Sequence, residues 1–416
     1  MTLLFLFFVG VLIILTQVKR GGLFVGLIIG YSINLFLVSL QRYVRPIFYS
    51  SDQQRFLDYA NELMSMDFYS FVSHFDPAGS YLISWFAALV FRVLGSDLLY
   101  VNFFFVYAWM GTVITSYKLS LFITEKRRAA TIISLFVAFI PSVSIINAAF
   151  LRESFIIFFL MSAFYYSCKW YVSRKAIFFL GSVFFMLLAG FFHGVLYFFV
   201  VLLVFFYLGD VFRRRHFRYA DLVIILILVP FFAVVSLKLV DNVKVQVVIS
   251  LFSSGGDSIE KYLSSNDDLD GFDDEASINA LRLPMVDLND PVSFGVSVVD
   301  RVFTFSYSPF LHQYYKLTDI PRIFDSIIFL TAIFLSFLIY KNGRSCSDAR
   351  VRFYLSVFMP LIILLVVMFA IGSSDVGTSQ RHRLKFFPVF WVITTSVYYL
   401  IQSKGRVNGC WGVSNG

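Results

Sequence analysis

The sequence predicts an all-α integral membrane protein, and three observations carry this prediction. Of the 416 residues, 59% are hydrophobic and only 14% are charged, which leaves too little polar surface to cover a soluble domain. Apolar runs recur along the chain, many of them near the roughly 17–25 residues that a helix needs to cross a bilayer. Lys and Arg gather in short clusters between these runs, as in the cytoplasmic loops of polytopic proteins.

The basic clusters order the runs into eleven predicted crossings. The clusters expected on the cytoplasmic side are Lys19-Arg20, 125–128, Arg174-Lys175, 213–218, 341–352 and 403–406. The predicted crossings lie at about residues 3–17, 22–40, 98–121, 129–149, 154–171, 175–192, 195–209, 220–240, 323–341, 353–371 and 384–402. This order places the N-terminus outside and the C-terminus in the cytoplasm. The first run lacks a small-residue cleavage site, so we interpret it as a retained helix.

One further apolar segment, residues 80–95, does not fit this order as a full crossing. Counting it would move the cluster at 125–128 to the outside and invert every later cluster. We therefore predict a juxtamembrane or re-entrant helix there, and twelve crossings are the alternative. The chain is then a single integral membrane domain, 1–416, with a first extracytoplasmic loop at 41–97, a large one at 241–322 and a short one at 372–383.

Charge, motifs and cysteines exclude several classes of function. The net charge of +8 is accounted for by the loop clusters, so no nucleic-acid partner is expected. The short cytoplasmic loops contain neither a P-loop nor a glycine-rich fingerprint after a strand, so a cytosolic nucleotide donor is not expected. Cys168, Cys346 and Cys410 are far apart and have no partner at metal-ligand spacing. We expect no disulfide, no metal site and no cofactor.

The first extracytoplasmic loop contains an acidic amphipathic stretch, "SSDQQRFLDYANELMSMDFYSF". Asp52, Arg55, Asp58 and Glu62 are separated by three, three and four residues, so a helix would place them on one face. One interpretation is a surface helix with solvated charges. The other is a carboxylate held at the membrane boundary, where Asp52 or Asp58 accepts a hydroxyl proton as a general base.

Ionisable residues interrupt apolar sequence at two helix tips on the same predicted side. Arg152 and Glu153 lie in "AAFLRESFIIFF"; such residues are costly within a membrane and are usually paired or functional, although they also mark helix turns at the interface. The planar fork of Arg152 suits a phosphate. His193, in "LAGFFHGVLYFF", is either a buried histidine bonded to a backbone carbonyl or a proton acceptor for a substrate.

A basic cluster near the C-terminus lies on the predicted outer side, against the usual charge bias. It contains Arg381, His382, Arg383 and Lys385, and an anionic ligand such as a lipid pyrophosphate would explain it. Arg301 lies in the aromatic-rich end of the large loop, whose rings suit either sugars or a membrane interface.

The large loop also contains an acidic stretch, "SSNDDLDGFDDEAS", that partly matches a calcium-binding loop. Asn266, Asp268, Asp270 and Gly271 fit its start, but Ser277 stands where a bidentate Glu belongs. We interpret this stretch as a solvated acidic loop.

These motifs resemble those of a known group of proteins. The chain is similar to the EpsG and Wzy-type polysaccharide polymerases of bacteria in the order of three features: an acidic first outer loop, then "GSDLLYVNFFFVYAWMG", then "LRES…KW…RKAIFFLGSVFFMLLAGFFHGVLYFF". In that group an Arg at a helix tip is followed by a His beside a small residue. Arg152 and His193 match this pattern, whereas Glu153 stands where the group more often has Gln. "RHRLKFFPVF" resembles the Arg-rich closing motif of GT-C membrane glycosyltransferases, which place a catalytic Asp or Glu in the first outer loop.

The resemblance implies a GT-C-like fold and a polymerase of lipid-linked oligosaccharide repeats at the outer face of the bacterial inner membrane. The growing chain on polyprenyl pyrophosphate would be the donor and a new lipid-linked repeat the acceptor. The expected catalytic residues are Asp52, Asp58, Glu153 and His193, and the residues expected to bind pyrophosphate or sugar are Arg55, Arg152, Arg301, Arg381 and Arg383. Membrane lipids and a chain-length regulator protein are further expected partners.

Three other functions remain open at this point. A GT-C glycosyltransferase with a polyprenyl-phosphate monosaccharide donor would need the same outer carboxylate and anion site. A flippase or other transporter is a second alternative, although the large outer loop and the lack of evident internal repeats speak against it. A membrane O-acyltransferase built around His193 is the third.

Overall fold

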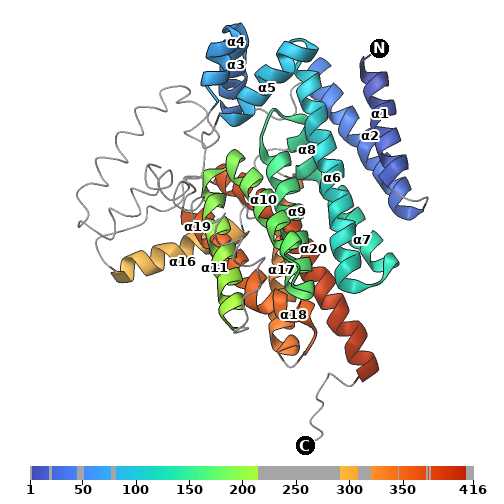
Figure 1. The fold of residues 1–416 in the computed structure, drawn as a ribbon, viewed down its shortest axis with the longest axis vertical. Coiled ribbons are helices and arrows are strands. Elements are labelled where there is room, and N and C mark those ends of the chain that lie inside the picture. Colours follow the sequence, from blue (N-terminus) through green and yellow to red (C-terminus); the bar gives the residue numbers. More distant parts are fainter. Residues whose placement is uncertain are drawn as a thin grey trace, which may run out of the picture. The chain divides into compact units, whose positions relative to one another are not determined.

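In the computed structural model of the protein, the described residues fold as helices and contain no strand (Figure 1). The described residues are 2–17, 21–44, 51–75, 81–213, 291–307, 320–344, 346–371, 373 and 376–408. The predicted crossing at 220–240, the acidic stretch at 264–277 and the aromatic residues at 308–315 lie outside them.

The described helices follow the apolar runs closely. They are α1 (Thr2–Gln17), α2 (Gly22–Tyr43), α3 (Ser51–Ser65), α4 (Phe68–Ser73), α5 (Leu82–Leu94), α6 (Leu98–Thr124), α7 (Arg127–Ala138), α8 (Pro141–Ala148), α9 (Glu153–Ser173), α10 (Ala176–Phe192), η1 (Gly194–Leu196), α11 (Tyr197–Arg213), α16 (Pro291–Tyr307), α17 (Ile320–Gly343), α18 (Ala349–Phe353), the π-helix η4 (Tyr354–Phe358), α19 (Met359–Ile371) and α20 (Val376–Asn408).

Seven helical segments of the described chain are long and apolar enough to cross a membrane. They are Gly22–Tyr43, Leu98–Thr124, Glu153–Ser173, Gly194–Phe212, Ile320–Gly343, Ala349–Ile371 and Thr378–Lys404. The pair α7 and α8, bent by 50° at the break between them, makes an eighth if it counts as one broken span. The prediction of a polytopic helical membrane protein is confirmed at this level, and the count of eleven crossings stays a prediction.

The chain divides into two compact units. The first consists of residues 1–208, 315–360 and 384–416, and the second of residues 209–314 and 361–383. The first unit contains α1 to α10, α17 and α18. The second contains α16 and most of α19.

Close helix packing in the first unit depends on small residues of α2. Gly22, Gly26 and Gly30 recur every four residues, the spacing that lets membrane helices approach closely. A Cβ atom added at Gly30 would lie 2.8 Å from the ring of Trp109 on α6, and one added at Gly26 would overlap the side chain of Leu135 on α7. These glycines therefore set the distance from α2 to α6 and α7.

One end of the first unit is joined by an ionic cluster from three distant segments. Nη1 of Arg350 donates to Oε1 of Glu125 at 2.6 Å, and Nη2 donates to Oδ2 of Asp348 at 2.8 Å. Nζ of Lys404 donates to the same carboxylate oxygen at 2.5 Å. Burial of Asp348 raises its pKa, but the hydrogen bonds from Arg350 and Lys404 outweigh burial and hold that pKa well below its usual range. Three of the predicted cytoplasmic clusters thus meet at one end, as the predicted topology requires.

The opposite end of the first unit carries the predicted amphipathic stretch as α3, packed against α4 and α5 (Figure 1). Leu63, Phe71 and Ala88 form the small core between these helices, and the ring of Trp85 stacks on Phe71 with centroids 4.8 Å apart. α5, predicted as a non-spanning helix, has 13 residues. At about 1.5 Å per residue it is roughly 20 Å long, shorter than a hydrocarbon core of about 30 Å.

Candidate functional site

The candidate site is built around a break between two helices of the first unit. α8 ends at Ala148 and α9 begins at Glu153, and the connecting residues Ala149, Phe150 and Leu151 are fully buried. Irregular backbone at membrane depth is tolerated only where protein covers it or where it lines a cavity. Broken helices of this kind often border substrate sites in membrane proteins, because they present unbonded backbone groups and side chains away from lipid.

A chain of buried hydrogen bonds holds this break in place. Nδ2 of Asn147 donates to Oδ1 of Asn34 on α2 at 2.8 Å, and the hydroxyl of Ser154 donates to Oδ1 of Asn147 at 2.7 Å. Asn34 in turn donates to the carbonyl of Gly30 at 2.8 Å. On the other side, Nδ2 of Asn102 on α6 donates to the carbonyl of Ala148 at 3.3 Å. Side chains from two other helices, α2 and α6, thus fix where α8 stops and α9 starts.

Arg152 caps the start of α9 and reaches the amphipathic helix α3. Its guanidinium carbon lies 5.6 Å from the ring centroid of Phe56, a residue that is itself buried. At this distance the cation and the ring attract each other. The structure therefore brings together two stretches that the sequence singled out separately, the acidic first loop and the Arg152 helix tip.

The two candidate carboxylates of α3 differ in their surroundings. Asp52 precedes Phe56 by four residues, so both lie on one side of α3. Asp52 is partly buried and forms a salt bridge with Arg55. Asp58 is exposed and accepts a hydrogen bond from Nε2 of Gln54 at 2.7 Å. Arg55, which was expected to bind pyrophosphate or sugar, is paired with Asp52 in the structure.

Glu153 is completely buried as the first residue of α9. A carboxylate in the first turn of a helix interacts favourably with the partial positive charge of the helix N-terminus. It also follows Arg152 and precedes Ser154, so the charged pair and the hydrogen-bond chain share one turn.

His193 lies at the same end of the first unit as Arg152. α9 and α10 form an antiparallel hairpin, so the end of α10 returns to the start of α9. The ring of Phe192 stacks on that of Phe155 with centroids 5.2 Å apart, which fixes this alignment. His193 is half-buried and its backbone nitrogen donates to the carbonyls of Ala189 and Gly190 at 3.0 Å each. The helix tips predicted from the apolar sequence are therefore neighbours along one hairpin end.

The remaining predicted arginines lie in the second unit, where they bind helix ends. Nη1 of Arg301 donates to the carbonyls of Ile371 at 2.8 Å and Ser373 at 3.1 Å. Nη1 of Arg383 donates to the carbonyls of Phe305 and Ser306 at 3.0 Å each. Carbonyls at the C-terminal end of a helix lack intrahelical donors, and a cation there also complements the helix dipole. The sequence did not predict this use of the two arginines.

Arg381 and His382 lie beside Arg383 at the start of α20 and are half-buried. Nδ1 of His382 lies 3.2 Å from the hydroxyl of Ser373, and its ring packs against Phe369 with centroids 4.9 Å apart. The outer basic cluster therefore combines a structural arginine, Arg383, with two side chains nearer the surface.

Four site residues escaped the sequence analysis: Asn34, Asn102, Asn147 and Ser154. Each lies within an apolar run and carries no charge, so a search for ionisable residues passes over it. The available signal was an uncharged polar side chain in a predicted crossing, since Asn and Ser side chains form hydrogen bonds between membrane helices.

The described residues contain no group of three His, Cys, Asp or Glu side chains that could hold a metal ion. Comparisons of the chain with protein-family models, curated proteins and solved structures match nothing.

Proposed function

We propose that the protein joins polyprenyl-pyrophosphate-linked oligosaccharide repeats into a surface polysaccharide at the outer face of the bacterial inner membrane, on a GT-C-like scaffold. The observation that carries the proposal is the contact between Arg152, at a buried helix break, and Phe56 of the carboxylate-bearing helix α3. An anion-binding cation and a candidate base thus share one end of a membrane-embedded unit. This pairing is what transfer of a sugar from a lipid pyrophosphate requires.

The reaction moves one glycosyl group. The acceptor hydroxyl oxygen bonds to the anomeric carbon of the donor sugar, and the bond from that carbon to the pyrophosphate oxygen breaks. The hydroxyl proton passes to a base on the protein, and the polyprenyl pyrophosphate leaves with the bonding electron pair. The protein has to neutralise the leaving group and orient the acceptor.

In this proposal Arg152 binds the leaving pyrophosphate through its planar fork. Asp52, one turn from Phe56, takes the hydroxyl proton, and its salt bridge with Arg55 holds the carboxylate in place. Glu153 and His193 flank the same helix ends; His193 is the alternative base and Glu153 positions Arg152.

The arginines of the second unit take a different part in the proposal. Arg301 and Arg383 hold helix ends through backbone carbonyls, so they position the segment that bears Arg381. Arg381 is the pyrophosphate contact that we propose within the second unit.

The test is deletion of the gene followed by gel analysis of surface polysaccharide, with complementation by variants. The proposal expects a single repeat on every acceptor in the deletion strain, and no rescue by Arg152→Ala. Arg174→Ala, at the other end of the same helix, is the matched control and should rescue. Loss of even the first repeat would indicate the monosaccharide glycosyltransferase, and normal polymer without the gene would refute both.

A further inference from the structure

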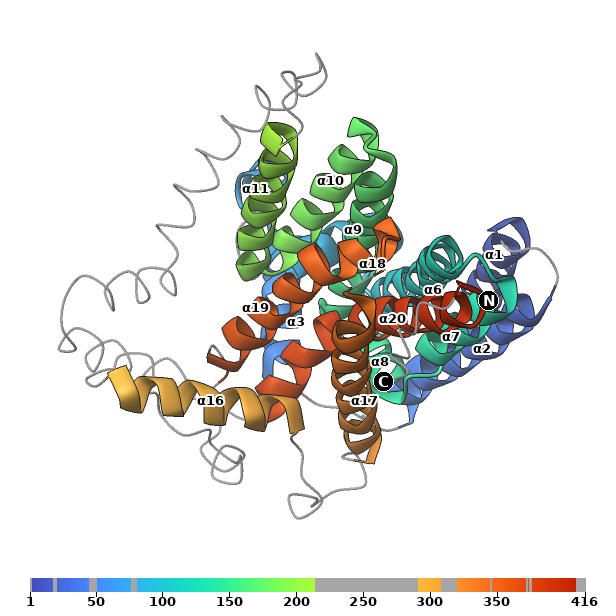
Figure 2. The same cartoon turned by 90° about the horizontal axis from the view of Figure 1, so that it is seen from below.

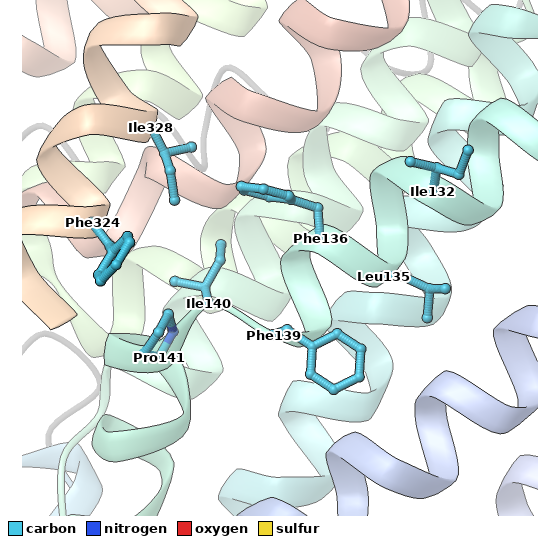
Figure 3. Close-up of a pocket in the computed structure, with 8 residues that line it drawn as sticks. All are labelled: Ile132, Leu135, Phe136, Phe139, Ile140, Pro141, Phe324 and Ile328. Atoms are coloured by element: carbon cyan, nitrogen blue, oxygen red, sulfur yellow. The ribbon is translucent and has the colours of Figure 1, made fainter.

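An apolar hollow of about 400 Å³ opens on the first unit at the bend between α7 and α8. Figure 3 shows Phe324 and Ile328 of α17 facing Phe136 and Ile140 across it. Its lining consists of Ile132, Leu135, Phe136, Phe139, Ile140, Pro141, Phe324 and Ile328. No lining residue has a polar side chain.

The hollow exists because the predicted crossing at 129–149 is interrupted. α7 ends at Ala138, and Pro141 starts α8 in the first-turn position that a proline favours. The two helices are bent by 50°, so α17, which packs beside α8, cannot follow both of them (Figure 2). Phe136 is held against the ring of Trp391 on α20, with centroids 4.6 Å apart, and forms a fixed wall.

Hydrocarbon is the filling that this hollow accepts. Four lining side chains, Ile132, Phe136, Phe139 and Phe324, are exposed at the surface of helices with the length and composition of membrane spans. In a bilayer that surface faces lipid, and water has no polar partner inside an apolar hollow of this kind. A lipid chain can enter from the side.

The hollow and Arg152 are linked by one short helix. Arg152 follows Pro141 by eleven positions, of which seven steps are helical at about 1.5 Å and four are not helical at up to about 3.5 Å, so the two residues are at most roughly 25 Å apart. The start of α7 lies by contrast near the ionic end of the unit, two residues after Glu125. A lipid with its phosphate at Arg152 could therefore place part of its chain in the hollow.

We propose that this hollow binds the polyprenyl chain of the lipid-linked substrate. The inference rests on the proposed function, because it takes Arg152 as the pyrophosphate contact. The three phenylalanine rings and the branched isoleucines make a broad, irregular wall that suits methyl-branched isoprene units better than a straight acyl chain. The hollow then fixes the depth and direction of the lipid while Arg152 fixes its head.

The test is photo-crosslinking of purified protein in nanodiscs with a polyprenyl phosphate that carries a photoreactive group on its chain, followed by peptide mapping. The expected labels fall on α7, α8 and α17. Ile328→Trp fills the hollow and should lower labelling about tenfold, the change given by about 1.4 kcal/mol of lost binding. Ile327→Trp, on the adjacent residue of α17 that is 55% exposed and does not line the hollow, is the matched control and should label as the unsubstituted protein does.

Three results would overturn the inference. Labelling outside these helices, equal labelling of both tryptophan variants, or equally effective competition by phosphatidylglycerol would show that the hollow is no polyprenyl site. If Ile328→Trp fails to insert into the membrane, Ile132→Trp fills the hollow from α7 instead. Its labelling should fall by the same factor, and labelling equal to that of the unsubstituted protein would overturn the inference. No polymer is measured, so a failure here leaves the Arg152 complementation test standing, and failed complementation leaves the labelling interpretable.

Discussion

Replacing Asn147 by Ala should loosen the helix break on which the candidate site depends. The amide of Asn147 makes two buried hydrogen bonds, to Oδ1 of Asn34 at 2.8 Å and from the hydroxyl of Ser154 at 2.7 Å. Hydrogen bonds between membrane helices contribute about 0.6 kcal/mol on average, with a maximum near 1.7 kcal/mol. The two bonds therefore predict a loss of about 1–3 kcal/mol in the free energy of unfolding.

Thr112→Ala provides the matched control for this variant. Thr112 is equally buried, but its hydroxyl donates to the carbonyl of Ala108 in its own helix, so no second helix loses a partner. We expect a loss of about 0.5–1.5 kcal/mol from the deleted methyl group, and a larger loss from Asn147→Ala, which removes buried volume together with two hydrogen bonds between helices. Reversible unfolding in mixed detergent micelles, followed by tryptophan fluorescence, measures both variants under one protocol.

A double substitution separates the hydrogen bond from the loss of side-chain volume. Asn34→Leu with Asn147→Leu removes both amides, so neither is left buried without its partner. The double variant should lose less stability than the sum of the two single leucine variants. Additive losses, or an Asn147→Ala protein as stable as the Thr112→Ala control, would show that the hydrogen-bond chain does not hold the break.

Three further predictions concern charged residues. Arg152→Ala should abolish polymer formation while the protein still inserts into the membrane. Arg152→Lys should restore polymer poorly, because an ammonium cannot reproduce a bidentate fork. Normal polymer from the alanine variant on a gel would show that this arginine is a topological anchor only. Asp52→Asn should lower the polymerisation rate with purified lipid-linked repeats by about 10²–10⁴-fold, which is the usual contribution of a positioned base. Asp58→Asn should change that rate little. Equal rates for the two variants would indicate that His193 is the base. Because the pKa of Asp348 in the folded protein lies below its unfolded value of about 3.9, its stabilising contribution is present above that pH and is lost as the pH falls further. Asp348→Asn should therefore flatten the fall in unfolding free energy below about pH 4, and an unchanged pH profile in chemical denaturation would contradict this.

The sequence predicted most crossings but not the interruption of one of them. The run at 129–149 is apolar on both sides of Pro141, so its composition reads as one continuous span. The proline was the available signal, because it cannot donate the hydrogen bond that would continue a helix through it. The packing of α8 beside α17, which comes nearly two hundred residues later in the chain, had no local signal at all.

The contrast between charged residues and apolar sequence identified the ionisable residues of the site. It did not identify the uncharged residues that form hydrogen bonds around the helix break. Arg152, Glu153 and His193 stand out in apolar sequence, and the structure places them at one hairpin end. The partner of Asn147 is Asn34, 113 residues away, and no local pattern connects them. For Arg301 and Arg383 the sequence identified the residues but not their role. Their charge predicted binding of an anionic ligand, whereas in the described structure both donate hydrogen bonds to carbonyls at helix ends.

The ionic cluster also affects folding during synthesis and the choice of C-terminal truncations. It consists of Glu125, Asp348, Arg350 and Lys404. Its last member, Lys404, follows Asp348 by 56 residues and lies near the end of α20, so Asp348 can pair with it only after most of that helix has been synthesised. The cluster can close only when that helix has been inserted. A protein truncated before Lys404 would leave Asp348 with Arg350 alone, whereas an affinity tag added after residue 408 leaves all four side chains in place.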